Sequence, residues 1–109
     1  MNRIIKLPKA DIVFDYRSSS DIVMEACARS TPLKVAGFCE TEKILILSLE
    51  DNTMPEKYEY VFAKFPSENE DDIIGEIRSR FFAGFSTLGS FHLNNETWGL
   101  FSKTGPTPS

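Results

Sequence analysis

The sequence has few of the residues that identify small functional domains: two cysteines, one histidine and one tryptophan among 109 residues. Cys27 and Cys39 are too few for a disulfide framework, so we expect two free thiols in a reducing compartment, the cytoplasm. No apolar run approaches the roughly 18 residues of a membrane span, and the N-terminal segment lacks the apolar centre of a signal peptide. These absences predict a cytoplasmic protein that does not enter a membrane.

Basic residues are outnumbered by acids, and the formal net charge is −4. This balance argues against nonspecific binding to nucleic acid. The negative charge is concentrated in residues 40–76, which contain eleven acids and three bases, whereas both flanking segments are net positive. If these acids gather on one surface, they favour a basic protein partner. The alternative is that they disperse over loops and a helix start, where water and the helix dipole stabilise them.

The sequence contains no motif that carries a reaction or a cofactor. His92 lacks a second ligand at a metal-site spacing, and residues 84–89 fit neither a nucleophile elbow nor a phosphate-binding loop. A catalytic cysteine–histidine pair requires Cys39 and His92 to meet in space, which the sequence leaves open. We therefore expect no cofactor and no metal, and we favour a non-catalytic protein.

The chain is long enough for one domain with a hydrophobic core, and 41% of its residues are apolar. We place this domain at residues 1–102. The last seven residues, KTGPTPS, contain two prolines and no large apolar side chain. Residues 103–109 are therefore predicted to form a flexible tail.

The first two thirds of the chain contain the patterns of one helix and five strands. A helix of about ten residues is predicted to begin near Ser18 and Asp21, which have the spacing of a capping box, and to end before Thr31-Pro32. The predicted strands are 4–7, 11–16, 33–39, 43–49 and 57–65. Because residues 43–49 are apolar on both faces, we expect that strand to be the central one.

The longest helical pattern begins at Ser67, which has Glu70 three residues later, or at a second candidate N-cap, Asn69. The apolar residues that follow recur at steps of three or four and define one face of a helix: Ile74, Ile77, Phe81, Phe85 and Leu88, with Ile73 and Phe82 widening the stripe. We expect this face to cover a sheet. Gly84 and Gly89 are the two candidate ends of the helix.

Two short strands, 90–93 and 96–101, flank the dipeptide Asn94-Asn95, which tolerates the positive φ angles of a tight turn. A two-residue turn places Phe91 opposite Trp98 and His92 opposite Thr97. An aromatic pair across the strands would then hold the hairpin.

The element order is (β)βαβββαββ, where the parentheses mark the short first strand, 4–7. It predicts an α+β fold: one antiparallel sheet of about five to six strands with two helices on one face, loosely ferredoxin-like. The third consecutive strand in the middle of the chain departs from the simple ferredoxin-like order.

Two functions fit these features. The first is a protein-interaction module, a small acidic regulator or an inhibitor or immunity-type protein that docks on a basic partner, with a homodimer through a sheet edge as an option. The second is a small-molecule-binding domain with an aromatic pocket between the second helix and the C-terminal hairpin. The residues predicted to bind the partner or ligand are Phe82, Phe85, Phe91, His92 and Trp98.

Overall fold

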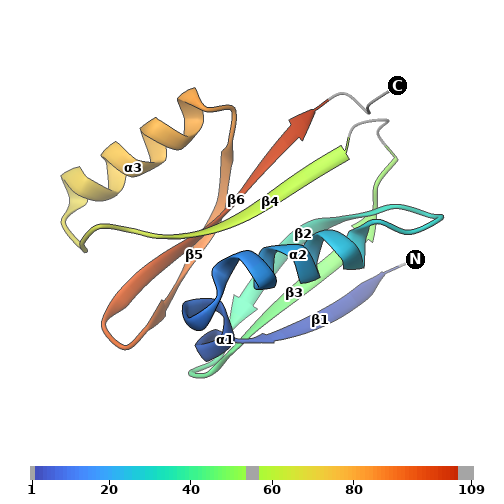
Figure 1. Cartoon of the computed structure of the whole chain (residues 1–109), viewed down its shortest axis with the longest axis horizontal. Helices are drawn as coiled ribbons and strands as arrows, with labels where there is room; N and C mark the ends of the chain where they lie inside the picture. Colours follow the sequence, from blue (N-terminus) through green and yellow to red (C-terminus); the bar gives the residue numbers. More distant parts are fainter. Residues whose placement is uncertain (1, 54–56, 106–109) are drawn as a thin grey trace.

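Two three-stranded antiparallel sheets form the framework of the protein (Figure 1). The computed structural model describes residues 2–53 and 57–105. The first sheet has the strand order β1-β3-β2, and the second has the order β4-β6-β5. In chain order the elements are β1 (Arg3–Pro8), α1 (Lys9–Phe14), α2 (Tyr16–Cys27), β2 (Leu33–Glu40), β3 (Ile44–Asp51), β4 (Lys57–Lys64), α3 (Glu70–Phe82), β5 (Ser86–Leu93) and β6 (Glu96–Gly105).

The prediction of an α+β fold is confirmed, but the single sheet of five to six strands is wrong. Strand β3 is central, as predicted, and its two neighbours are β2 and the N-terminal strand β1. β1 pairs with β3 from Arg3 opposite Leu49 to Pro8 opposite Ile44. Since β1 occupies the edge that a third meander strand would need, β4 pairs with β6 instead and begins a second sheet.

The segment 11–16, predicted as a strand, lies in two helices, so the described chain has three helices instead of two. Ile12 is fully buried, but Phe14 is 91% exposed, so the alternating pattern does not correspond to a buried sheet face. Asp15 is the N-cap of α2, because its side chain accepts a hydrogen bond from the backbone N–H of Ser18. The cap therefore lies three residues before the predicted helix start.

The C-terminal hairpin has the predicted register. Phe91 lies opposite Trp98, His92 lies opposite Thr97, and both turn residues, Asn94 and Asn95, have positive φ angles. Strand β6 continues through Gly105, beyond the predicted domain boundary, and pairs there with β4. The remaining residues of the predicted tail, 106–109, lie outside the described part of the chain.

Helix α3 begins at the second candidate cap, where the side chain of Asn69 accepts a hydrogen bond from the N–H of Asp71. It ends earlier than the apolar stripe suggested. Gly84 has a φ of +92°, a conformation that stops the helix, so the next residue, Phe85, lies in a connection and Leu88 lies in β5. None of the helical residues of α3 is buried, and Phe81, predicted to face a sheet, is 69% exposed.

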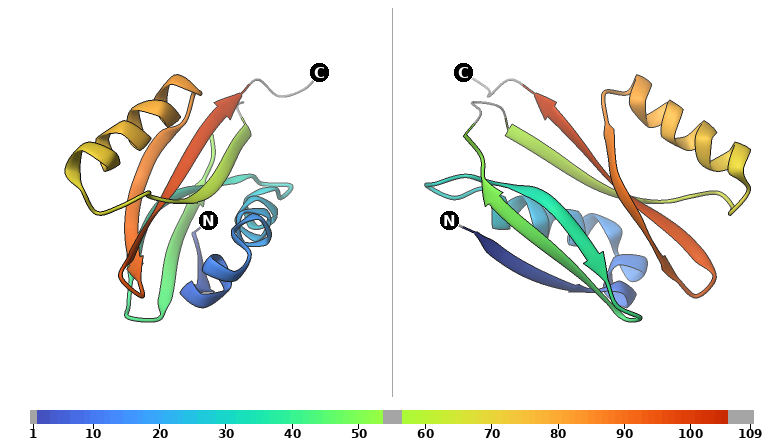
Figure 2. Two further views of the ribbon diagram at one scale, coloured as in Figure 1. Left: turned by 60° about the vertical axis from the view of Figure 1, so that its left-hand side comes forward. Right: turned by 180° about the vertical axis from the view of Figure 1, so that it is seen from behind.

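The two sheets share one hydrophobic core with α1 and α2. Its buried members come from both sheets and from both helices: Leu7, Ile12, Val23, Ala26, Cys27, Leu33, Val35, Leu45, Leu47, Leu49, Tyr60, Phe62, Phe91, Trp98 and Leu100. A smaller cluster of Ala63, Phe65 and Phe101 lies under α3, against Ile73, Ile77 and Phe85. Helix α3 and the α1–α2 pair therefore lie on different sides of the molecule (Figure 2); they do not share one sheet face as predicted.

Tyr60 joins the two sheets by a buried hydrogen bond, because its hydroxyl accepts from the N–H of Val35 at 2.8 Å. Replacing Tyr60 by phenylalanine leaves that buried N–H without an acceptor, so we expect a loss of about 1–3 kcal/mol in the free energy of unfolding. Urea denaturation measures this change. Tyr58→Phe is the control: its ring stacks on Tyr60, but no hydrogen bond within the described chain engages its hydroxyl. Equal stability of the two variants would contradict the prediction.

Candidate functional site

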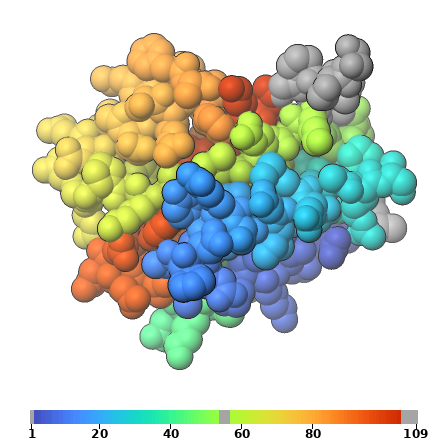
Figure 3. All heavy atoms as spheres, viewed as in Figure 1, coloured from blue at the N-terminus to red at the C-terminus, as the bar shows by residue number. Residues whose placement is uncertain are grey.

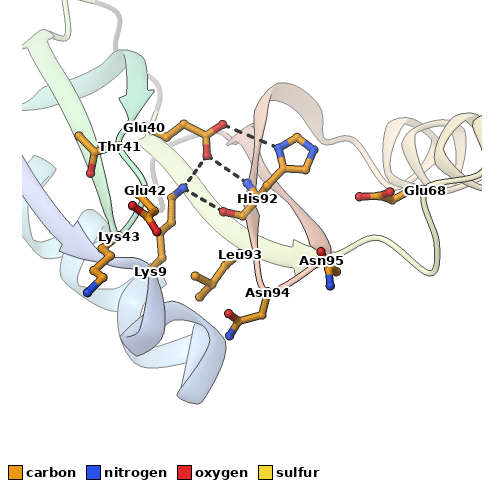
Figure 4. Close-up of a pocket in the computed structure, with 10 residues that line it drawn as sticks. All are labelled: Lys9, Glu40, Thr41, Glu42, Lys43, Glu68, His92, Leu93, Asn94 and Asn95. Atoms are coloured by element: carbon orange, nitrogen blue, oxygen red, sulfur yellow. Dashed lines mark hydrogen bonds and ion pairs between the residues drawn. The ribbon is translucent and has the colours of Figure 1, made fainter.

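An open groove of about 610 Å³ lies where the two sheets approach each other (Figure 4). Its walls come from the start of α1, the β2–β3 turn, the segment before α3 and the β5–β6 turn. The lining residues are mostly charged or polar: Lys9, Glu40, Thr41, Glu42, Lys43, Glu68, His92, Leu93, Asn94 and Asn95. The groove therefore collects polar side chains from segments that are up to 86 positions apart in sequence, from Lys9 to Asn95.

An ion pair between Lys9 and Glu40 crosses the floor of the groove. The ammonium nitrogen Nζ of Lys9 lies 2.7 Å from Oε2 of Glu40 and also donates to the carbonyl oxygen of His92 at 2.9 Å. The same Oε2 accepts from the backbone N–H of His92 at 3.0 Å. Lys9 is 3% exposed, so the ion pair and these hydrogen bonds compensate a charge that is almost fully removed from water.

This arrangement covers part of a sheet edge. β5 is an edge strand of the second sheet, and both backbone polar groups of His92 bind side chains that come from outside that sheet. Lys9 and Glu40 thus take the place that a neighbouring strand would occupy at this residue. The contact fixes the edge of the second sheet against the end of β2 in the first.

Electrostatics at Glu40 favour its charged form. Desolvation is the largest single influence and acts to raise the pKa of Glu40. The hydrogen bonds from Lys9 and from the backbone N–H of His92, together with the electrostatic attraction of the Lys9 and His92 side chains, outweigh it. The pKa of this carboxyl is therefore below its usual value.

A lowered pKa predicts that acid destabilises the protein through Glu40. As the pH falls, the Glu40 carboxylate takes up a proton at a higher pH in the unfolded chain than in the folded one. The contribution of Glu40 to stability is therefore complete above the unfolded pKa, about 4.5. It is lost as the pH falls through the lower pKa of the folded state. We expect the stability of Glu40→Gln to fall less than that of the wild type as the pH is lowered from 7 to below this window. Urea unfolding at several pH values measures the difference. Parallel pH profiles would contradict the prediction.

The rim of the groove offers acceptors and amides that are open to solvent. Glu42 is exposed, and no hydrogen bond or ion pair within the described residues engages it. Glu68, on the opposite side, accepts one hydrogen bond, from the hydroxyl of Thr97 at 3.3 Å. The exposed side chains of Asn94 and Asn95 lie between them on the hairpin turn (Figure 4). The rim can therefore accept and donate hydrogen bonds, and Glu42 and Glu68 outnumber Lys43, its one cation.

The groove does not assemble a nucleophile and a base from the residues that line it. The imidazole of His92 is 60% exposed, and its Nδ1 lies 3.8 Å from Oε1 of Glu40, too far for a hydrogen bond. The hydroxyl of Thr41 is engaged by the backbone of Ile44. Cys39 is a free, exposed thiol that is not among the lining residues, and Cys27 is free and buried. Within the described chain, no group of three or more metal-ligating side chains gathers.

The five residues predicted to bind a partner lie in different surroundings. Phe91 and Trp98 fill the shared core, Phe85 is half-buried beneath α3, and Phe82 is 82% exposed at the end of that helix. His92 alone among them lines the groove. The structure does not bring these side chains together into one aromatic pocket.

Sequence reasoning missed Lys9 and Glu40, which organise the groove. Lys9 follows a proline and Glu40 ends a strand, so each has the local pattern of an ordinary surface residue. No local signal separates a buried lysine from an exposed one, because its burial depends on a carboxylate 31 positions away. Their pairing is a property of the tertiary fold.

No family model, curated protein or solved structure matches this chain. None of the helices in the described ranges is long and apolar enough to cross a membrane.

Proposed function

We propose that the protein is a non-catalytic interaction module that binds a positively charged segment of a protein partner in the groove between the sheets. The observation that carries this proposal is the convergence of Glu40, Glu42 and Glu68 on one groove, beside the side-chain amides of the hairpin turn. Lys9 neutralises Glu40, and Glu42 and Glu68 then exceed the remaining lysine of the lining, Lys43, by one charge, which a cation from outside can balance. Carboxylates that receive lysine or arginine give specificity and fast, salt-dependent association.

The start of α3 extends this acidic rim. Glu70, Asp71 and Asp72 follow Glu68 within four residues, and all are exposed. Other acids of the segment 40–76 point elsewhere; Glu50, for example, pairs with Lys34. The acidic segment is thus partly dispersed, and the groove rim with the first turn of α3 is the part that supports a docking surface.

Titration of the isotope-labelled protein with a lysine- and arginine-rich peptide tests the proposal by nuclear magnetic resonance. We expect shift changes to concentrate on the groove, to weaken as salt is added, and to be lost in the double variant Glu42→Lys, Glu68→Lys. The control variant Glu25→Lys changes an exposed acid on α2 and should bind as the wild type does. Shift changes that are spread over the surface, or equal in the two variants, would contradict the proposal.

A further inference from the structure

The outer side of α3 carries large apolar side chains that the rest of the described chain leaves uncovered. The inner side packs Ile73 and Ile77 on the small cluster under the helix. On the outer side Ile74 is 41% exposed and Phe81 is 69% exposed. In the space-filling view α3 stands at the margin of the molecule, apart from α1 and α2 (Figure 3).

These side chains form one strip along the helix. Ile74 and Phe81 are seven residues apart, and at 100° per residue their directions differ by about 20°. Arg78, also exposed, lies within about 40° of Ile74 on the same strip. Exposed apolar side chains that are bordered by charged residues in this way can be covered by a protein partner.

Charge is distributed unevenly between the two ends of the strip. The first turn of α3 carries Glu70, Asp71 and Asp72. The second half carries Arg78, and Lys103 of β6 lies beside Gly84, just past the end of the helix. The strip therefore begins with acidic residues, and further along it carries the cation Arg78 between Ile74 and Phe81.

We propose that a second copy of this chain covers the strip, with the two α3 helices packed antiparallel about a two-fold axis. Such packing brings the acidic start of each helix towards Arg78 of the other, so one surface is complementary to itself. If the helices cross at their midpoints, Arg78 of each copy comes within about one turn of Asp71 of the other, and Phe81 within about one turn of Ile74. The two helix dipoles are then antiparallel, which is electrostatically favourable.

The strip shares the acidic first turn of α3 with the proposed docking surface, but Ile74, Arg78 and Phe81 do not line the groove, so a test at Phe81 separates the dimer from the proposed function. Sedimentation equilibrium of the full chain over a range of protein concentrations tests it. We expect a monomer–dimer equilibrium whose dissociation constant rises at least about tenfold in Phe81→Glu, because a buried aromatic contact is replaced by a charge. The control Phe14→Glu changes a phenyl ring that is more exposed but lies on α1, and it should dimerise as the wild type does.

A charge exchange provides a second test that does not rely on a disruptive variant. Arg78→Glu and Asp71→Arg should each weaken the dimer, because each places like charges across the interface. Mixing the two variants should restore association, since every cross-helix pair in the mixed dimer is then oppositely charged. A chain that stays monomeric at all concentrations, a Phe81→Glu dimer as strong as the wild type, or variants that do not recover on mixing would each overturn the proposal.

Discussion

Replacing Glu40 by alanine is expected to lower the free energy of unfolding by about 3 kcal/mol. The substitution leaves the ammonium group of Lys9, which is 3% exposed, with one hydrogen-bond acceptor, the carbonyl of His92. It also leaves the edge N–H of His92 without the carboxylate that it binds. The estimate lies at the lower end of the range for buried ion pairs because the Glu40 side chain is 35% exposed.

Glu42→Ala is the matched control for this prediction. Glu42 lies two residues further along the same turn and lines the same groove, but it makes no ion pair among the described residues. Its loss should change the free energy of unfolding by no more than about 0.5 kcal/mol. Urea denaturation compares both variants with the wild type, and similar stabilities for Glu40→Ala and Glu42→Ala would show that the ion pair does not join the sheets.

Replacing Gly99 by alanine is expected to destabilise the protein by about 1–3 kcal/mol through overpacking. Gly99 lies in the central strand of the second sheet, between the rings of Phe65 and Phe101. A Cβ atom at this position would lie 2.9 Å from the nearest carbon of Phe101 and 3.0 Å from the nearest carbon of Phe65. Both rings are buried and pack against each other, so neither can move away easily.

Gly37→Ala provides the comparison, because a Cβ atom there would meet no atom within 4 Å. We expect its stability to stay within about 0.5 kcal/mol of the wild type. Thermal unfolding of the two variants measures the contrast. If Gly99→Ala proved as stable as Gly37→Ala, the close packing of the rings beside Gly99 would be contradicted.

Local chemistry determined the parts of the fold that the sequence predicted well. The turn at Asn94-Asn95 sets the hairpin register, because both residues tolerate positive φ angles. The residues of β3 are apolar on both faces of the strand, which indicated a central strand with a neighbour on each side. In both cases a few adjacent residues contain the whole signal.

The error in the sheet topology arose where distant segments compete for the same place in the fold. β1 takes the free edge of β3, and no pattern within β4 reveals that its partner is β6. Asp15 caps α2 and so divides the apparently alternating segment 11–16 between two helices, α1 and α2. Gly84, one of the two candidate ends, stops α3 before Phe85, although the apolar spacing continues through that residue.

The most direct test of the proposed role is to capture a binding partner from the cells that make the protein. The captured partner is then titrated against the protein at increasing salt concentrations. We predict that the captured protein presents a basic segment and that its affinity falls steadily as salt is added. The double variant Glu42→Lys, Glu68→Lys should lose the binding, whereas Glu25→Lys should keep it. A partner that binds independently of salt, and equally well to the double variant, would contradict docking in the groove.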